Sequence, residues 1–161
     1  MYNKPEINYA LAAEQIRALA EEEPHYVALL ANASAMLWEL LGGPEGSINW
    51  CGFYIMRGGR LVLGPFQGRP ACIHIDLSRG VCGAAARTGE TQLVPDVHAF
   101  PGHIACDEAS RSEVVVPIFV SGKISAVLDI DSPEEGHFTE KDARGLELAA
   151  LAIGETMEGL E

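Results

Sequence analysis

The chain has 161 residues, 48% of them apolar and 21% charged, which is enough for a buried core and argues against disorder. Its net charge of -12 disfavours nucleic acid and anionic membrane surfaces as partners, and no apolar run approaches the roughly 20 residues that span a bilayer. The N-terminus has no basic region leading into an apolar core, so we expect a cytoplasmic protein without a signal peptide.

Two helices are predicted within residues 8–42. Apolar residues recur at helical spacing from Asn8 to Glu22, which predicts the first helix. The second has a wide apolar face; Pro24 can open it, and the pair Gly42-Gly43 can end it. Both apolar faces need a partner surface, which the middle of the chain supplies.

Residues 47–132 are predicted to form a sheet with the loops that carry the chemistry. Short apolar runs between turn residues predict six strands: Ser47–Met56, Leu61–Gln67, Ala71–Leu77, Thr91–Pro95, Glu113–Val120 and Ile124–Ile130. Gly58-Gly59 and Ser121-Gly122-Lys123 are typical hairpin turns. The alanine-rich segment Gly80–Thr88 predicts a short helix instead.

A last helix is predicted over residues 139–160. Thr139, with Asp142 three residues later, resembles a capping box at its start. Together these elements predict an α+β fold in one domain, residues 1–161. We expect an antiparallel sheet of about six strands, with the N- and C-terminal helices packed on one face.

Three cysteines are candidates for chemistry, because thiols in a cytoplasmic protein stay reduced unless they are used. We expect Cys72 on a strand, Cys82 at the start of the short helix and Cys106 on the long irregular stretch Asp96–Ser112. A helix N-terminus can lower the pKa of a thiol, which favours Cys82 as a reactive group. Cys51 alternates with apolar neighbours and is interpreted as core filling.

Three acids accompany the cysteines. Asp129 and Asp131 are two residues apart on a strand, so they share one face, and Glu113 opens the strand paired with it. Carboxylates this close repel unless a cation or a shared proton lies among them. A substrate ammonium would supply the cation, and a raised carboxyl pKa would supply a general acid. The alternative is a solvated acidic edge.

Other chemistries find less support in the sequence. His74, His98 and His103 lie near the thiols and could bind zinc, but no Cys-x-x-Cys pair occurs, and we expect no metal. No Gly-x-Ser-x-Gly motif indicates a serine hydrolase. Gly80-Val81-Cys82-Gly83 matches a phosphate-binding loop only loosely.

Several motifs resemble one family. They are Asn49-Trp50-Cys51-Gly52-Phe53-Tyr54, Leu63-Gly64-Pro65-Phe66-Gln67-Gly68, Gly80-Val81-Cys82-Gly83, Asp96-Val97-His98, Gly102-His103-Ile104-Ala105-Cys106-Asp107, Ser112-Glu113 and Val127-Leu128-Asp129-Ile130-Asp131-Ser132. The chain is similar over nearly its whole length to the free methionine-(R)-sulfoxide reductases, which have a GAF domain. The segment around Cys106 is more specific than the fold, since GAF domains bind many ligands or none.

The resemblance implies a role for each site residue. Cys106 matches the catalytic cysteine, Cys72 the resolving cysteine and Cys82 an auxiliary cysteine. The implied substrate-binding residues are two aromatic residues and three acids: Trp50, Tyr54, Glu113, Asp129 and Asp131. The chain departs from the family pattern at Cys51, where a small residue without a thiol is usual.

The resemblance also implies a reaction without a cofactor. Free L-methionine (R)-S-oxide is reduced to L-methionine, Cys106 becomes a sulfenic acid, and a disulfide with Cys72 is recycled by a thioredoxin-type reductant. The apolar terminal helices make a homodimer the expected assembly. The alternative is a non-catalytic GAF sensor that binds a small molecule and needs no thiols.

Overall fold

The computed structural model describes residues 6–22, 25–103 and 108–158. In this part of the chain the strands form a six-stranded sheet in the order β3-β2-β1-β6-β5-β4, and every neighbouring pair is antiparallel. The strands are β1 (Trp50–Arg57), β2 (Arg60–Gly68), β3 (His74–Ile75), β4 (Gln92–Val94), β5 (Ser112–Val120) and β6 (Lys123–Ser132). The predicted antiparallel sheet is confirmed.

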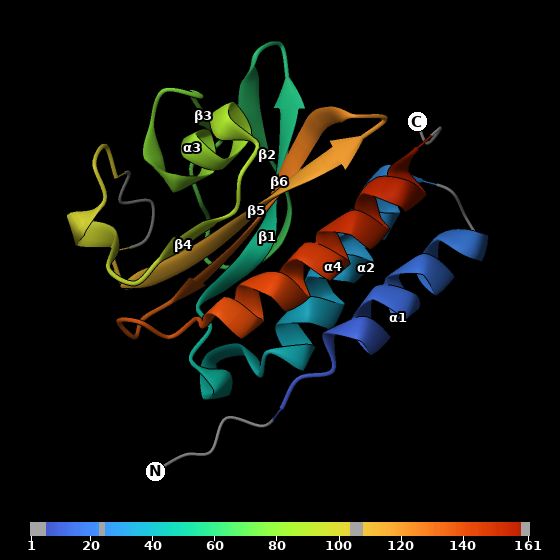
Figure 1. Ribbon diagram of the computed structural model, residues 1–161, viewed down its shortest axis with the longest axis horizontal. Coiled ribbons are helices and arrows are strands. Elements are labelled where there is room, and N and C mark those ends of the chain that lie inside the picture. The colour runs from blue at the N-terminus through green and yellow to red at the C-terminus, as the bar shows by residue number, and fades with distance from the viewer. Residues whose placement is uncertain (1–5, 23–24, 104–107, 159–161) are drawn as a thin grey trace.

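The helices separate into two groups on opposite faces of the sheet (Figure 1). On one face, α2 (Tyr26–Leu40) and α4 (Glu140–Met157) cover the strands, and α1 (Tyr9–Glu22) packs against α4. On the other face lies the short helix α3 (Gly80–Thr88), with the loops around it. Two 3-10 turns, η1 (Gly43–Gly46) and η2 (Val97–Ala99), complete the described elements. The helices predicted at both ends of the chain therefore share one face, as expected.

Alternation along β1 divides its side chains between the two faces. Cys51, Phe53 and Ile55 are buried in the core under α2 and α4, whereas Trp50 and Tyr54 are buried under α3. Successive side chains of a strand point to opposite faces, so this period of two follows from the backbone. The sheet consequently has two apolar layers, one on each side.

Both predicted hairpin turns are present. Gly58 and Gly59 have φ of 60° and 79° between β1 and β2, and Ser121 and Gly122 have φ of 51° and 77° between β5 and β6. Two positive φ angles in succession form the mirror-image turn whose twist matches that of antiparallel strands. Glycine adopts these angles without strain, which explains why three of the four positions are glycines.

The start of α4 is fixed as the sequence predicts. The Thr139 side chain accepts a hydrogen bond from the Asp142 backbone, and the Asp142 carboxylate accepts one from the Thr139 backbone. The same carboxylate accepts a hydrogen bond of 2.8 Å from the Tyr9 hydroxyl of α1. This capping box therefore also joins the first and last helices.

The third strand differs from the prediction. A strand was expected over Ala71–Leu77, but β3 comprises only His74 and Ile75, and Cys72 lies in the loop before it. Pro70 has no backbone N–H to donate, which disfavours strand pairing at the start of this segment. Among the described residues, no helix combines the length and the apolarity needed to cross a bilayer.

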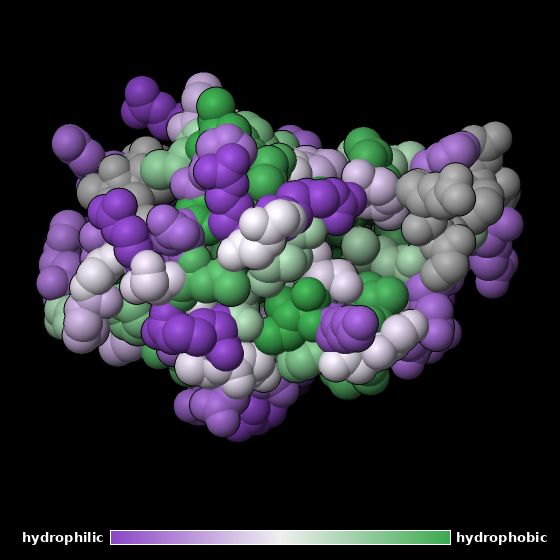
Figure 2. Space-filling view, turned by 90° about the horizontal axis from the view of Figure 1, so that it is seen from above, coloured by the Kyte–Doolittle hydropathy of each residue, from purple (hydrophilic) through white to green (hydrophobic). Residues whose placement is uncertain are grey.

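Hydrophilic side chains cover much of the outer surface. In the view from above, they alternate with small apolar patches (Figure 2). This distribution agrees with the net charge of -12, which lies on solvated side chains for the most part. The buried acids described next are the exception.

Candidate active site

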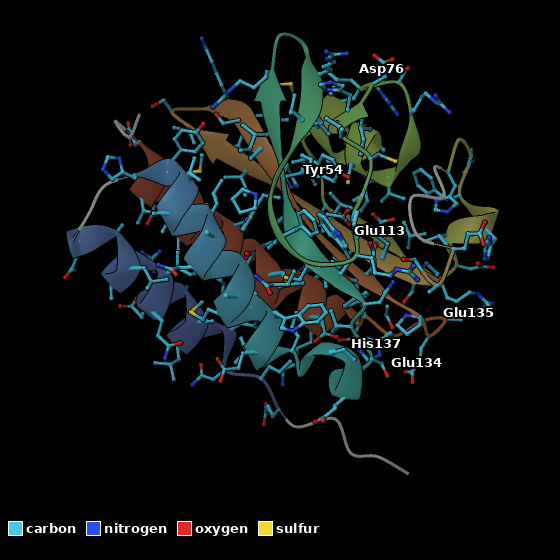
Figure 3. The ribbon with its side chains drawn as sticks, turned by 180° about the vertical axis from the view of Figure 1, so that it is seen from behind. Tyr54, Asp76, Glu113, Glu134, Glu135 and His137 are labelled. Carbon is cyan, nitrogen blue, oxygen red and sulfur yellow. The ribbon has the colours of Figure 1, made fainter. Side chains whose placement is uncertain are left out.

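A small cavity of about 50 Å³ lies on the face of the sheet that α3 covers. Six of the predicted site residues line it: Trp50, Tyr54, Cys82, Glu113, Asp129 and Asp131. Figure 3 shows Tyr54 and Glu113 on this face, away from the cluster of Glu134, Glu135 and His137 beyond β6. The structure thus brings together side chains from β1, α3, β5 and β6.

The three acids meet through the register of β5 and β6. Glu113 is paired with Asp131, and Asp129 lies two residues before Asp131 on the same face. Glu113 is only 8% exposed and Asp129 only 5% exposed. The predicted shared face is confirmed, and the alternative of a solvated acidic edge is wrong for these two residues.

Burial raises the pKa of the Glu113 carboxyl well above its usual value, and the nearby charges of Asp129 and Asp131 raise it further. The pKa of Asp129 is also raised by burial, while hydrogen bonds from Glu113 and Cys82 act in the opposite direction. Burial and like charge thus act in the same direction on Glu113, whereas hydrogen bonds oppose burial at Asp129, so the pKa of Glu113 is raised by more causes than that of Asp129.

Cys82 lies in the first turn of α3, as predicted, but its thiol is not activated. Burial raises the pKa of the Cys82 thiol well above its usual value, and the charges of Asp129 and Glu113 raise it further. The side chain is 4% exposed and donates a hydrogen bond to Asp129. The prediction that the helix N-terminus favours the thiolate is wrong, because desolvation and neighbouring acids outweigh it.

An aromatic wall, formed by Trp50 and Tyr54 of β1, lies beside the acids in the cavity, since Trp50 is paired with Asp131 of β6. The Trp50 ring stacks on Tyr54 with centroids 5.8 Å apart and on Phe66 of β2 with centroids 5.2 Å apart. Gly52 permits this stacking, because a Cβ there would lie 2.3 Å from the Phe66 Cβ. The result is an apolar, aromatic surface beside the acids, suited to a ligand with one apolar and one cationic end.

The remaining cysteines differ in state. Cys72 is partly buried and disulfide-bonded, and it follows the cavity-lining residues Pro70 and Ala71. Cys51 is a fully buried free thiol on the opposite face of the sheet, consistent with core filling. Cys106, the predicted catalytic cysteine, lies outside the described residues.

The metal alternative can be tested on the described residues. Among them, the one group of side chains close enough to share an ion is Cys82, Glu113 and Asp129, whose donor atoms lie within 4.8 Å of one another. None of the three histidines considered for zinc belongs to it. Hydrogen bonds already link these three side chains, so shared protons account for their proximity without an ion.

Two polar residues that line the cavity were not predicted to bind substrate. Ser110 lines it and accepts a hydrogen bond of 3.0 Å from the Asn49 amide. His103 also lines it, and burial followed by the charge of His98 lowers its pKa. The backbone N–H of Gly80 donates to Gly102, which holds the turn before His103 at the start of α3. No pattern in the sequence marks Ser110, whereas His103 stood within a quoted motif.

Comparisons with known proteins identify the family of this chain. The GAF domain model matches residues 18–158. The free methionine-R-sulfoxide reductase of Escherichia coli is 49% identical over 89% of this chain and 84% of its own. Two solved structures with bound substrate are also similar. One is fRMsr of Staphylococcus aureus, 46% identical with a TM-score of 0.87 over 97% of this chain and 99% of that one. The other is the free methionine-R-sulfoxide reductase of Neisseria meningitidis, 42% identical with a TM-score of 0.85 over 92% of this chain and 87% of that one.

Proposed function

Because the chain belongs to the free methionine-R-sulfoxide reductases of the GAF-domain family, we propose that it reduces free L-methionine (R)-S-oxide to L-methionine. It is an oxidoreductase that acts on a sulfur group. The observation that carries the proposal is the buried acid pair Glu113–Asp129, which lines the same cavity as the Trp50–Tyr54 wall. A free amino acid with an S-methyl group has the matching ends.

The pocket explains selection of a free amino acid. An ionised Asp129, together with Asp131, would hold the substrate ammonium, which relieves the cost of burying negative charge. One Asp129 oxygen is buried without a hydrogen-bond partner among the described residues, so it can accept a bond from a ligand. Trp50 would pack on the S-methyl group, because sulfur and aromatic rings attract. A peptide-bound sulfoxide has an uncharged amide instead of the ammonium.

The chemical step needs a nucleophile and an acid. Cys106 would attack the sulfoxide sulfur as a thiolate, while the departing oxygen gains protons. Glu113 is the proposed proton donor, because burial and the neighbouring acids raise its pKa, which favours the protonated form. The bond between the two sulfurs then breaks as the oxygen moves from the substrate sulfur to the Cys106 sulfur, so methionine leaves and Cys106 remains as a sulfenic acid.

The disulfide step would join Cys72 to that sulfenic acid. The Cys72 thiol attacks, a sulfur–sulfur bond forms, and the oxygen leaves as water. Two observations support Cys72 in this role: it is disulfide-bonded, and both Cys51 and Cys82 are free thiols. A thioredoxin-type reductant would restore both thiols by exchange. Cys82, with its raised pKa, is proposed only as an auxiliary thiol.

The assembly proposed is a cytoplasmic homodimer with one GAF domain per chain. Its basis is a set of exposed apolar side chains on the outer faces of α1 and α4: Leu11, Leu148 and Leu151. Their exposed fractions are 53%, 45% and 56%, and pairing through these helices would bury them. A monomer mass by light scattering at micromolar concentration would contradict the dimer.

The decisive experiment is turnover of each diastereomer of free methionine sulfoxide, measured as NADPH oxidation through thioredoxin reductase and thioredoxin. We expect turnover of the R form, and little of the S form or of N-acetylated R-sulfoxide. Without thioredoxin, the reduced protein should form one equivalent of methionine per subunit and lose two free thiols. A protein that binds the sulfoxide without losing thiols would instead be a sensor, and the proposal would fall.

Cys106→Ser tests the nucleophile in the same assay. A hydroxyl is a far poorer nucleophile than a thiolate, so we expect the single turnover itself to disappear. Cys72→Ser should keep one equivalent of methionine and lose efficient recycling. A full methionine yield from Cys106→Ser would move the nucleophile to another cysteine.

A further inference from the structure

The two aromatic residues of the cavity wall also hold the loop that carries Cys72. The Tyr54 hydroxyl donates a hydrogen bond of 2.9 Å to the Cys72 carbonyl oxygen. The Trp50 indole N–H donates one of 3.1 Å to the Arg69 carbonyl oxygen. Both donors belong to β1, so the wall of the cavity and the loop between β2 and β3 are joined directly.

These bonds matter because the loop lies outside the sheet. Arg69 to Ile73 follow the last paired residue of β2 and precede the two-residue strand β3, so ladder bonds do not hold Cys72 itself. The next backbone anchor is the Leu63 N–H, which donates to the Ile73 carbonyl at 2.9 Å. The Tyr54 side chain is only 2% exposed, so water does not readily replace its hydroxyl.

We propose that Tyr54 is a positioning residue for Cys72, which it holds in the place where the disulfide forms. This inference rests on the proposed function, in which Cys72 resolves a sulfenic acid. One side chain would then serve both half-reactions, its ring facing the substrate and its hydroxyl holding the resolving loop. Trp50 acts in the same way on the other end of the loop.

The hydroxyl should affect the second step more than the first. In disulfide formation the Cys72 sulfur attacks the sulfenic sulfur, the oxygen leaves with a proton as water, and no outside oxidant is needed. The rate depends on how long the thiol stays within reach of its target. Loss of this buried hydrogen bond would lower that rate by about tenfold.

The experiment measures both steps in one sample of Tyr54→Phe. Reduced protein is mixed with free methionine R-sulfoxide, and aliquots are quenched over time. Methionine release is followed by chromatography, the Cys72 disulfide by mass spectrometry, and sulfenic acid by dimedone labelling. Tyr26→Phe is the matched control, because its hydroxyl accepts a bond of 3.0 Å from Arg57 and belongs to α2 on the other face.

We expect Tyr54→Phe to slow disulfide formation about tenfold relative to methionine release in the same variant, with more dimedone adduct than in wild type. Tyr26→Phe should leave the ratio of the two rates unchanged. Equal slowing of both steps, or of neither, would overturn the positioning role. Absence of methionine from the wild-type protein would instead refute the proposed function.

A second variant tests the same proposal in case Tyr54→Phe folds poorly. Trp50→Phe keeps an aromatic ring and removes the N–H that holds Arg69. Its disulfide formation should also slow relative to methionine release, by a smaller factor, because Arg69 lies farther from the thiol in the chain. An unchanged ratio in Trp50→Phe would contradict the proposal independently.

Discussion

The two faces of the central strands contain buried thiols with opposite surroundings. Cys51 of β1 lies among Phe53, Ile130 and the helices, whereas Cys82 lies beside Glu113 and Asp129 under α3. Burial raises the pKa of both thiols. Burial alone therefore does not distinguish a structural layer from a reactive one, and the charges of Asp129 and Asp131 act on Cys51 as well; the difference is that Cys82 donates a hydrogen bond to Asp129. The helix-covered face stabilises the fold, and the α3 face combines burial with ionisable groups.

Asp129→Ala should show the largest difference in catalytic effect between a substitution on the α3 face and one on the helix-covered face. Removing the carboxylate would lower kcat/KM, with a loss of transition-state stabilisation of roughly 2–5 kcal/mol, because a desolvated charge pair with the substrate ammonium is broken. Steady-state kinetics with free methionine R-sulfoxide measure it. The neighbouring Ile130→Val is the control, because Ile130 faces the helices and should lose only about 1 kcal/mol of stability. Wild-type kinetics in Asp129→Ala would remove the acid from the site.

Glu113→Gln tests the electrostatics of the α3 face through pH. Because the folded pKa of Glu113 is raised, the folded protein binds a proton that the unfolded chain releases above the ordinary value of 4.5. Wild-type stability should therefore be highest at acidic pH and fall as pH rises towards the raised pKa. Glutamine carries no proton to lose, so this part of the pH dependence should vanish.

The measurement is urea unfolding of both proteins between pH 5 and pH 8. The advantage of Glu113→Gln over wild type should grow with pH by up to about 1.4 kcal/mol per unit. On the helix-covered face, Leu146→Met is a control without a titrating group and should shift stability equally at every pH. A difference between wild type and Glu113→Gln that shrinks as pH rises would contradict the raised pKa.

Some of this contrast is predictable from sequence. The spacing of Asp129 and Asp131 places them on one face, and the Thr139–Asp142 pair marks the start of α4, because both depend on local geometry. The state of Cys82 is not predictable in this way. Its position in a helix is local, but its burial depends on α3 closing over acids from distant strands. Cys72 was misplaced for a similar reason, since β3 pairs only where β2 reaches it.

Tyr9→Phe tests how much a buried polar contact contributes to stability on the helix-covered face. The Tyr9 hydroxyl donates to Asp142 at 2.8 Å, and burial raises its pKa. Loss of this bond should lower the free energy of unfolding by about 1.5 kcal/mol, because a hydrogen bond to a buried carboxylate is removed. Denaturant unfolding and kcat/KM are measured together. A loss of activity without a loss of stability would show that the two faces are coupled.

Cys51→Ala and Cys82→Ala compare the two buried thiols directly and carry the smallest expected effects on stability. Cys51 does not line the cavity, and its free thiol is 0% exposed among apolar side chains. Cys51→Ala should therefore cost roughly 1 kcal/mol of stability and leave kcat/KM unchanged. Cys82→Ala removes a hydrogen-bond donor to Asp129, which alters the balance of protons between Asp129 and Glu113. It should therefore shift the pH profile of kcat/KM, which Cys51→Ala should not. If both variants shift that profile, the acids sense thiols through the sheet, and the separation of its faces fails.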